Sequence, residues 1–567
     1  MKKTLLTCLI ISTFWVTQAY AIEADTIYTH GTIITINDKQ PSADAVAVKD
    51  GKIIGVGKNN KIMQMKGPQT AIVNLHGKTM LPGFFDGHSH FAEVGLQASS
   101  ANLLPKPDGN VNSILELQKS LRKFMASSVS VKTHGVLIGM NYDDSQLVEK
   151  RHPIRRDLDA VSTEIPIYAI HQSAHLAVLN SKALAQLGIT PETKNPSGGV
   201  IVREADGKTP NGILQENAFF NNLRNIIPKL SRQEAQQQIQ ASEAIYLSNG
   251  FTTVQDGKSS AEALKLLTLM AESGLLKVDV VSYADLVAIG DSPILHSAWM
   301  SRSYNNHFRI GGVKLIFDGS PQGKTAWFTQ PYFIPPTGEN TSYAGYPAFS
   351  DEEALKWYSL AYKNNWQMLT HTNGDAAIDQ LLKTVRTVQA VYPGDDRRTV
   401  MLHGQFTRKD QVAQIKELYI FPSLFPMHTF YWGDWHRQST VGPERAENSS
   451  PTNWMLENNI KFSIHSDAPV TFPNSMRILD SAVNRTTRTN FVLGYKQCLE
   501  PIIALKAMTI WPAYQHFEEN SKGSIEVGKL ADFVVLSKNP LKIIRQQLKD
   551  IQVLETIKED KVVYKRP

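Results

Sequence analysis

The chain has 567 residues, of which 42% are hydrophobic and 20% are charged, a composition typical of a globular protein with a large core. Its formal net charge is only +6, and no block of basic residues carries interleaved aromatic side chains, which excludes an obvious nucleic-acid partner. Chain length alone allows about two to four domains, or one long α/β barrel with additions.

The first 21 residues have the pattern of a secretory signal peptide. A basic start (KK) precedes the apolar run LLTCLIISTFWV, and AYA forms a small-x-small cleavage pattern. The run is too short to span a bilayer, and no second apolar stretch reaches that length, so we expect no membrane span. We expect cleavage near Ala21 and a periplasmic or secreted protein, with an N-terminal core helix as the alternative.

Cysteine is scarce in this chain. Removal of the signal peptide takes away Cys8 and leaves Cys498 as the only cysteine. We therefore expect no internal disulfide, and any metal ligands have to come from His, Asp, Glu or Lys.

Both ends of the remaining chain are rich in short strand patterns. Near the N-terminus, Asp50-Gly51 separates two apolar runs, which is a strong hairpin signal. Near the C-terminus, Glu559-Asp560 separates two similar runs. We expect residues 22–80 and 515–567 to form one domain from both termini, with two separate small modules as the alternative.

The middle of the chain, residues 81–514, alternates strands and helices. Short apolar runs that end in polar residues include PIYAIHQ, GFTTVQDG, VKLIFDG, WQMLTHTNGD, TVMLHGQ and KFSIHSDAP, and helical patterns lie between them. This alternation predicts the α/β class with a parallel sheet, and a (β/α)8 barrel with insertions fits the length. In such barrels the carboxyl ends of the strands carry the chemistry.

The first of these runs, LPGFFDGHSHF, brings two histidines close together in the sequence. His88 and His90 are two residues apart, so in an extended segment their imidazoles face the same way. Two imidazoles aimed at one point form half of a metal site, whereas the simpler interpretation is a polar turn with exposed histidines.

Four later residues follow the same strand-end rule. Lys314 lies inside the apolar run VKLIF, which favours burial over a surface or salt-bridge role. His371 and His403 end their runs, and Asp467 follows KFSIHS. The alternatives are a helix N-terminal position for His371 and a turn or N-cap aspartate for Asp467.

Taken in order, these stretches resemble the amidohydrolase superfamily, in the branch of the YtcJ-like and N-substituted formamide deformylase-like proteins. The matching segments are DAVAVKDGKIIGVG, LPGFFDGHSHF, GVKLIFDGSPQGKTAWF, LTHTNGDAAID, MLHGQF, SIHSDAPV and KGSIEVGKLADFVVL, and they cover nearly all of the chain after the signal peptide. The resemblance implies a distorted (β/α)8 TIM barrel beside a β-sandwich domain built from both termini.

The resemblance also implies a centre of one or two Zn²⁺ ions, or another divalent metal. In it, His88 and His90 bind the first metal, and His371 and His403 bind the second. Lys314, as a carbamylated lysine, bridges the two metals, and Asp467 is both a ligand and the proton shuttle. A lysine can react with CO2 only when its pKa is lowered, which burial and nearby cations achieve.

Four further residues are candidates for substrate binding. The resemblance places His175 toward the pocket, and His465 stands where the family more often has a small residue. His428 and Trp432 belong to the aromatic segment FPMHTFYWGDWHR, which predicts either an apolar pocket wall or a packing loop. Glu216 is a weaker candidate, since glutamate at a helix start is usually solvated.

The predicted activity is hydrolysis of a C–N bond, of the amide or N-substituted formamide type, in a small molecule by metal-activated hydroxide. A deaminase or an esterase or lactonase that uses the same centre remains open, as does a catalytically inactive binding protein of the same fold. We expect a small-molecule substrate and no nucleic acid, and a homodimer is compatible with the sequence.

Overall fold

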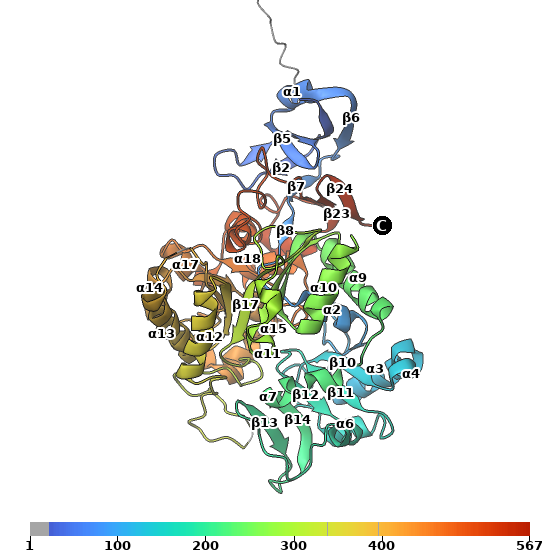
Figure 1. Ribbon diagram of the computed structural model, residues 1–567, viewed down its shortest axis with the longest axis vertical. Helices are drawn as coiled ribbons and strands as arrows, with labels where there is room; N and C mark the ends of the chain where they lie inside the picture. Colours follow the sequence, from blue (N-terminus) through green and yellow to red (C-terminus); the bar gives the residue numbers. More distant parts are fainter. Residues whose placement is uncertain (1–21, 337, 395) are drawn as a thin grey trace, which may run out of the picture.

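The computed structural model describes residues 22–336, 338–394 and 396–567, so the expected signal peptide lies outside the described residues. At its centre is an eight-stranded parallel sheet whose strands follow one another in chain order (Figure 1). The strands are β8 (Phe84–Phe85), β15 (Phe251–Ser259), β16 (Asp279–Asp285), β17 (Phe308–Ile316), β18 (Gln367–Thr372), β19 (Val400–His403), β20 (Phe421–Leu424) and β21 (Ser463–Ile464).

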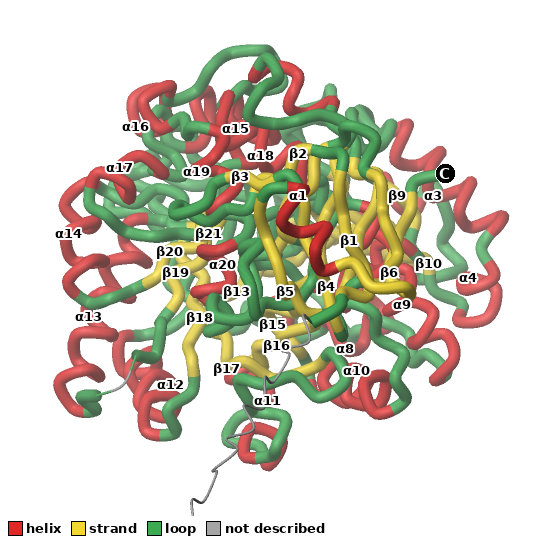
Figure 2. Tube along the Cα trace, turned by 90° about the horizontal axis from the view of Figure 1, so that it is seen from above, coloured by secondary structure: helices red, strands yellow, loops and turns green. Residues whose placement is uncertain are grey.

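Helices connect these strands and lie outside the sheet, as Figure 2 shows for the side formed by β18 to β20. Two of the connecting helices begin with a capping box, in which a serine and a glutamate three residues later satisfy each other's backbone N–H groups. The helices along this path are α9 (Arg232–Ser248), α10 (Ala261–Glu272), α11 (Leu286–Ile289), α12 (Asp351–Lys363), α13 (Asp375–Val391), α14 (Lys409–Glu417), α15 (Met427–Trp435), α17 (Thr452–Glu457), α18 (Ser475–Asn484), α19 (Pro501–Lys506) and α20 (Ile510–Gln515).

The sheet curls until the segments that follow its first and last strands meet. After β8 and β21, the His90 amide donates to the Ala468 carbonyl at 2.7 Å, and the Asp467 amide donates to the His88 carbonyl at 3.1 Å. All eight strands run the same way, so their carboxyl ends gather at one rim, as the strand–helix alternation predicts.

A second sheet lies in the connection between β8 and β15, at the end of the molecule away from the termini (Figure 1). We call it the insertion sheet; it is mixed and contains β9 (Ala101–Asn102), β10 (Leu137–Tyr142), β11 (Ile167–His171), β12 (Leu176–Leu179), β13 (Gly199–Arg203) and β14 (Pro210–Glu216). The run PIYAIHQ forms β11 here and is not a strand of the parallel sheet. Hydrophobic periodicity identifies a buried strand but does not say which sheet it joins, which explains the error.

The two chain ends form two further sheets. The first contains β5 (Lys52–Gly57), β4 (Ala45–Lys49), β1 (Ala24–Thr29) and β6 (Lys66–Asn74). The second combines both ends, in the order β24 (Lys561–Lys565), β23 (Val553–Lys558), β22 (Phe533–Leu536), β7 (Thr79–Pro82), β2 (Thr32–Ile34) and β3 (Ser42–Ala43). The C-terminal strand β22 pairs directly with the N-terminal strand β7, and Figure 1 shows β23 and β24 in the same region.

Both predicted hairpins are present. Asp50 and Gly51 turn between β4 and β5 with φ of 49° and 70°, and Glu559 and Asp560 turn between β23 and β24 with φ of 49° and 66°. Side chains of both terminal sheets, Tyr28 and Phe533 among them, belong to one apolar cluster. The described part of the chain contains no helix that is both long and apolar enough to cross a bilayer.

Candidate metal centre

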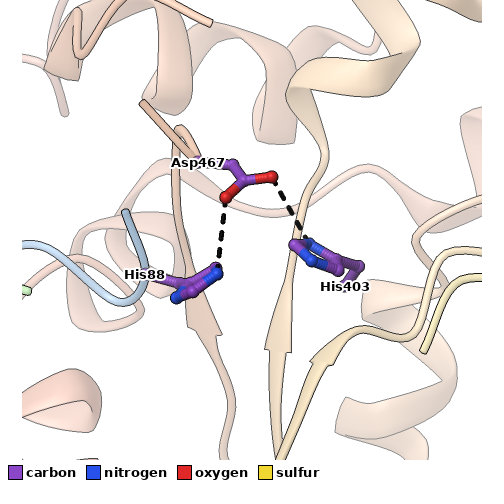
Figure 3. A group of neighbouring side chains, drawn as sticks. All are labelled: His88, His403 and Asp467. Carbon is purple, nitrogen blue, oxygen red and sulfur yellow. Dashed lines mark ion pairs between the residues drawn. The ribbon is translucent and has the colours of Figure 1, made fainter. Parts of the chain in front are cut away.

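Three predicted residues converge at the rim formed by the carboxyl ends of the strands. His88 Nε2 lies 3.4 Å from Asp467 Oδ1, and His403 Nδ1 lies 4.0 Å from Asp467 Oδ2 (Figure 3). One ligand atom from each of the three residues falls within 4.8 Å of the other two, which is the spacing of a cation site. The three residues are far apart in the sequence: His88 follows β8, His403 ends β19 and Asp467 follows β21.

The backbone at two of these positions is strained. His403, the last residue of β19, has a φ of 66°, and Asp467, just after β21, has a φ of 53°. Side chains other than glycine seldom adopt this left-handed conformation, and such strain concentrates at functional sites. The turns aim the imidazole and the carboxylate at one point.

Two more predicted ligands lie against this group. His90 Nε2 is 3.5 Å from Asp467 Oδ1, and Lys314 Nζ is 3.3 Å from His88 Nε2. The Lys314 side chain is buried, at 2% exposure, as its apolar neighbours in β17 predict. The sixth predicted ligand, His371 at the end of β18, has its ring centroid 4.6 Å from that of His403.

Two partners that orient these histidines were missed by the sequence analysis. Gln255 on β15 accepts from His88 Nδ1 at 2.5 Å, and Asp318, just after β17, accepts from His371 Nδ1 at 3.1 Å. Each contact fixes the ring and leaves Nε2 as the atom with the lone pair, the arrangement usual for metal-binding histidines. Asp318 could have been predicted as a site residue, because it is the polar residue that ends the apolar run VKLIFD.

Burial decides the charge states in the centre. It lowers the pKa of His88, His371 and His403 well below the usual range, with neighbouring cations acting in the same direction. Burial also lowers the pKa of Lys314 to about 7, so a neutral amine is accessible near neutral pH. Neutral imidazoles and a neutral amine are the forms that can donate lone pairs.

The site also leaves polar atoms without partners. His90 Nδ1, His403 Nδ1 and Asp467 Oδ1 are buried and make no hydrogen bond within the described residues. A buried polar atom left unpaired costs about 1–3 kcal/mol, so a group of them in one place indicates a missing partner. Imidazole nitrogens and a carboxylate form a donor set that suits Zn²⁺ or a similar divalent cation.

The candidate substrate residues differ in their distance from the centre. The His465 ring is fully buried, 5.3 Å from the His88 ring and 5.2 Å from the His403 ring, and neither of its nitrogens has a partner. It stacks on Phe425 at 4.8 Å, and His428 contacts the other side of Phe425 at 4.6 Å.

Trp432 continues this aromatic row away from the centre. Its ring lies 4.6 Å from that of His428, and its Nε1 donates to Asp143 Oδ2 at 2.9 Å. Trp432 is fully buried and joins α15 to the loop that follows β10 in the insertion sheet. Ring contacts therefore run from His403 through Phe425 and His428 to Trp432.

His175 approaches the centre from the insertion sheet. Its ring lies 5.0 Å from that of His371, and its Nδ1 lies 2.7 Å from Glu216 Oε2. Glu216 is only 6% exposed, so the expectation of a solvated glutamate is wrong. The carboxylate is buried because β14 pairs with β12 and carries it beneath His175.

A second histidine cluster in the insertion sheet is closed by its own hydrogen bonds. His171 Nε2 lies 3.0 Å from Asp144 Oδ1, while Nδ1 accepts from the Ser173 amide at 3.1 Å. Because Nδ1 is an acceptor, Nε2 carries the proton, and neither nitrogen of His171 offers a lone pair to a cation. This cluster is a hydrogen-bonded network, and His171 is fully buried in the interior.

Comparisons with known proteins agree with this geometry. The amidohydrolase family pattern matches residues 71–564. The chain is 26% identical to the protein LONG AFTER FAR-RED 3 of Arabidopsis thaliana over 92% of this chain and 89% of the relative. It is 25% identical to the N-substituted formamide deformylase of Arthrobacter pascens over 96% and 98% of the two chains.

A solved structure described as an uncharacterized metal-dependent hydrolase from Pyrococcus horikoshii OT3 has the same fold. Its TM-score is 0.72 at 24% identity, covering 92% of this chain and 99% of that one. The family match, which spans most of the chain, confirms the resemblance seen in the sequence. The chain belongs to the amidohydrolase family.

Proposed function

We propose that this enzyme hydrolyses the C–N bond of a small amide or N-substituted formamide at a divalent-metal centre. The observation that carries the proposal is the meeting of His88, His403 and Asp467, with unpaired buried atoms, at the rim of the parallel strands. The relative of similar length that is named for deformylation of N-substituted formamides supports this substrate type.

The proposed ligands are the six residues predicted from the sequence: His88, His90, Lys314, His371, His403 and Asp467. We propose Zn²⁺ as the cation, in one or two copies, because the donors are mainly imidazole and carboxylate. A bound cation of this kind lowers the pKa of water and polarises a carbonyl oxygen. The lowered pKa of Lys314 supports its carbamylation, since a neutral amine is the form that reacts with CO2.

Asp467 is proposed as the proton shuttle. Its Oδ1 is buried and has no hydrogen-bond partner, so the carboxylate can take a proton from the attacking water. It then passes the proton to the leaving amine nitrogen, because the two transfers occur one after the other. Gln255 and Asp318 hold the imidazoles of His88 and His371 in fixed orientations during this sequence.

We propose that the substrate binds between the centre and the insertion sheet. His175 and His465 are in ring contact with candidate ligands and supply polar contacts. His428 and Trp432 extend the wall behind Phe425, as the aromatic segment predicts.

The test is a hydrolysis screen with the zinc-loaded enzyme on matched N-formyl, N-acyl, ring-amidine, ester and lactone compounds. Release of an amine that requires metal supports the proposal. Turnover confined to ring amidines indicates a deaminase, and turnover confined to esters or lactones indicates an esterase or lactonase. Absence of turnover with a fully loaded centre favours a binding protein of this fold.

We also propose the domain organisation expected from the sequence: a barrel over residues 81–514 and a β-sandwich of residues 22–80 with 515–567. The apolar cluster shared by the two terminal sheets supports the sandwich. We propose that residues 1–21 direct export to the periplasm or the medium. Mass spectrometry of the mature protein tests this, because cleavage near Ala21 gives a defined N-terminus.

A further inference from the structure

His175 has one ring nitrogen fixed by a carboxylate and the other left for a ligand. Its Nδ1 lies 2.7 Å from Glu216 Oε2, and a carboxylate can only accept, so Nδ1 carries the proton. In that tautomer the lone pair is on Nε2. Within the described residues Nε2 makes no hydrogen bond, and the side chain retains 10% of its surface accessible.

The clamp on His175 is built by several features of the chain. The Glu216 amide also donates to the His175 carbonyl at 2.8 Å, so the two residues are joined twice. Glu216 adopts a φ of 48°, a strained conformation for a residue other than glycine. Gly319 makes space for the Glu216 side chain, because a Cβ at position 319 would lie 2.4 Å from Glu216 Oε1.

The clamped ring lies at the metal centre. Its centroid is 5.0 Å from that of His371, one of the proposed ligands, and Phe220 packs against it at 5.5 Å. The insertion sheet therefore brings a hydrogen-bond acceptor to the place where the substrate of the barrel would bind. This pair is difficult to predict from the sequence, because the two residues are 41 positions apart. His175 lies between β11 and β12, and Glu216 ends β14.

We propose that His175 Nε2 accepts a hydrogen bond from the N–H of the scissile amide, so that the enzyme selects secondary amides. Esters and lactones present an oxygen lone pair at this position, and N,N-disubstituted amides present an alkyl group. Each leaves this acceptor without a donor in the bound complex, which is expected to weaken binding by roughly tenfold. The inference rests on the proposed function and names the substrate class of the same site.

The test compares N-benzylformamide, N-benzyl-N-methylformamide and benzyl formate, with the matching acetyl and benzoyl series. Calorimetry on the full-length, zinc-loaded Asp467→Asn protein measures binding without turnover, and kcat/KM is measured on the wild type. We expect the secondary amide to bind about tenfold more tightly than its N-methyl and ester partners. Equal affinities within every series, or failure of every secondary amide to bind, overturn the inference.

Variants of the clamp separate its role from simple packing. In Glu216→Gln the side-chain amide can donate to His175 Nδ1, which moves the ring proton to Nε2 and turns an acceptor into a donor. We expect the preference for N–H to disappear while the far-UV spectrum and melting temperature stay close to wild type. His175→Phe is expected to lose the preference too, and a preserved preference in both variants overturns the inference.

The matched control is Asp291→Asn, which removes the carboxylate from another pair with a histidine. Asp291 lies 2.6 Å from His296, and both side chains are about half exposed, far from any role in the centre. The control is expected to keep the tenfold preference. A protein that shows the binding preference but no turnover would count against the proposed hydrolysis and in favour of this recognition. A protein that turns over substrate without the preference would support the hydrolysis and count against this recognition.

Discussion

Two buried polar clusters lie at opposite ends of the same parallel strands. The candidate metal centre, at the carboxyl ends, contains buried atoms without partners, such as His403 Nδ1 and Asp467 Oδ1. The second cluster, which we call the ion network, lies at the amino ends and joins the parallel sheet to the C-terminal segment. It consists of Asp279, Arg309, Glu518, Lys522, Asp532 and Lys558.

The ion network is held together by ion pairs among its own members. Asp279 lies 2.6 Å from Lys522 and 3.0 Å from Lys558, and Glu518 lies 2.7 Å from Arg309 and 2.6 Å from Lys522. Buried charges require such pairing, and each acid of the network lies against a lysine or arginine, although Arg309 Nε, Glu518 Oε2 and Asp532 Oδ2 make no hydrogen bond within the described residues. The comparison teaches that the kinds of group in a buried cluster decide its meaning. Acids paired with lysine and arginine form a structural joint, whereas imidazoles gathered around one carboxylate form a donor set for a cation.

The largest expected effect separates chemistry from folding. Asp467→Asn removes the proposed proton shuttle, and we expect turnover to fall by about 1000-fold with an unchanged fold. The measurements are steady-state hydrolysis and thermal unfolding of the zinc-loaded protein. A variant with wild-type turnover would remove the shuttle role from Asp467.

Breaking the ion network should affect stability and leave the chemistry intact. Lys558→Met leaves Asp532 without its nearest cation, and we expect a loss of about 3 kcal/mol in the free energy of unfolding. The matched control is Lys49→Met, whose partner Asp25 is 2.6 Å away and where both side chains are about 40% exposed. Its expected loss by denaturant titration is much smaller, because an exposed ion pair contributes little to stability. Equal losses would contradict the contrast between the two pairs.

The smallest expected effect is a pH dependence. Burial opposes ionisation of Asp279, but Lys522 and Lys558 outweigh it and hold the pKa of Asp279 well below its usual range. Lys522 and Arg309 likewise lower the pKa of Glu518. Carboxyls with lowered folded-state pKa stabilise the fold above their unfolded pKa of about 4, and this stability is lost as pH falls through the folded value.

The free energy of unfolding should therefore decline below about pH 4.5, and less steeply in Asp279→Asn. Urea titration between pH 6 and pH 3 measures both slopes. Identical slopes for the variant and the wild type would show that the network does not govern acid stability.

The residues at the carboxyl ends of the parallel strands were easier to predict from the sequence than the residues that contact them. Positions such as His88, His371 and His403 were predictable because each ends an apolar run, and parallel strands bring such ends together. Gln255 was missed because it lies within a buried strand, where a polar residue becomes meaningful only when its partner is known. Membership of the amidohydrolase family, inferred from motif order, is confirmed.

The insertion sheet was beyond the reach of single-chain patterns. PIYAIHQ has the same period as the strands of the parallel sheet, so nothing local separates β11 from them. Glu216 has a helix-start context in the sequence, yet long-range pairing of β12 with β14 buries it beside His175. The paired charges of Asp279 and Lys558 were equally hidden, because they are far apart in the chain.

The central claim, that the unpaired cluster is a metal centre, is tested most directly by the metal content of purified protein. We expect about one or two equivalents of zinc or a similar divalent ion per chain by plasma mass spectrometry. His403→Ala should lose at least one equivalent, whereas His296→Ala, on the surface, should keep the wild-type content. Wild-type protein that binds no divalent metal after reconstitution, or equal content in all three proteins, would contradict the account.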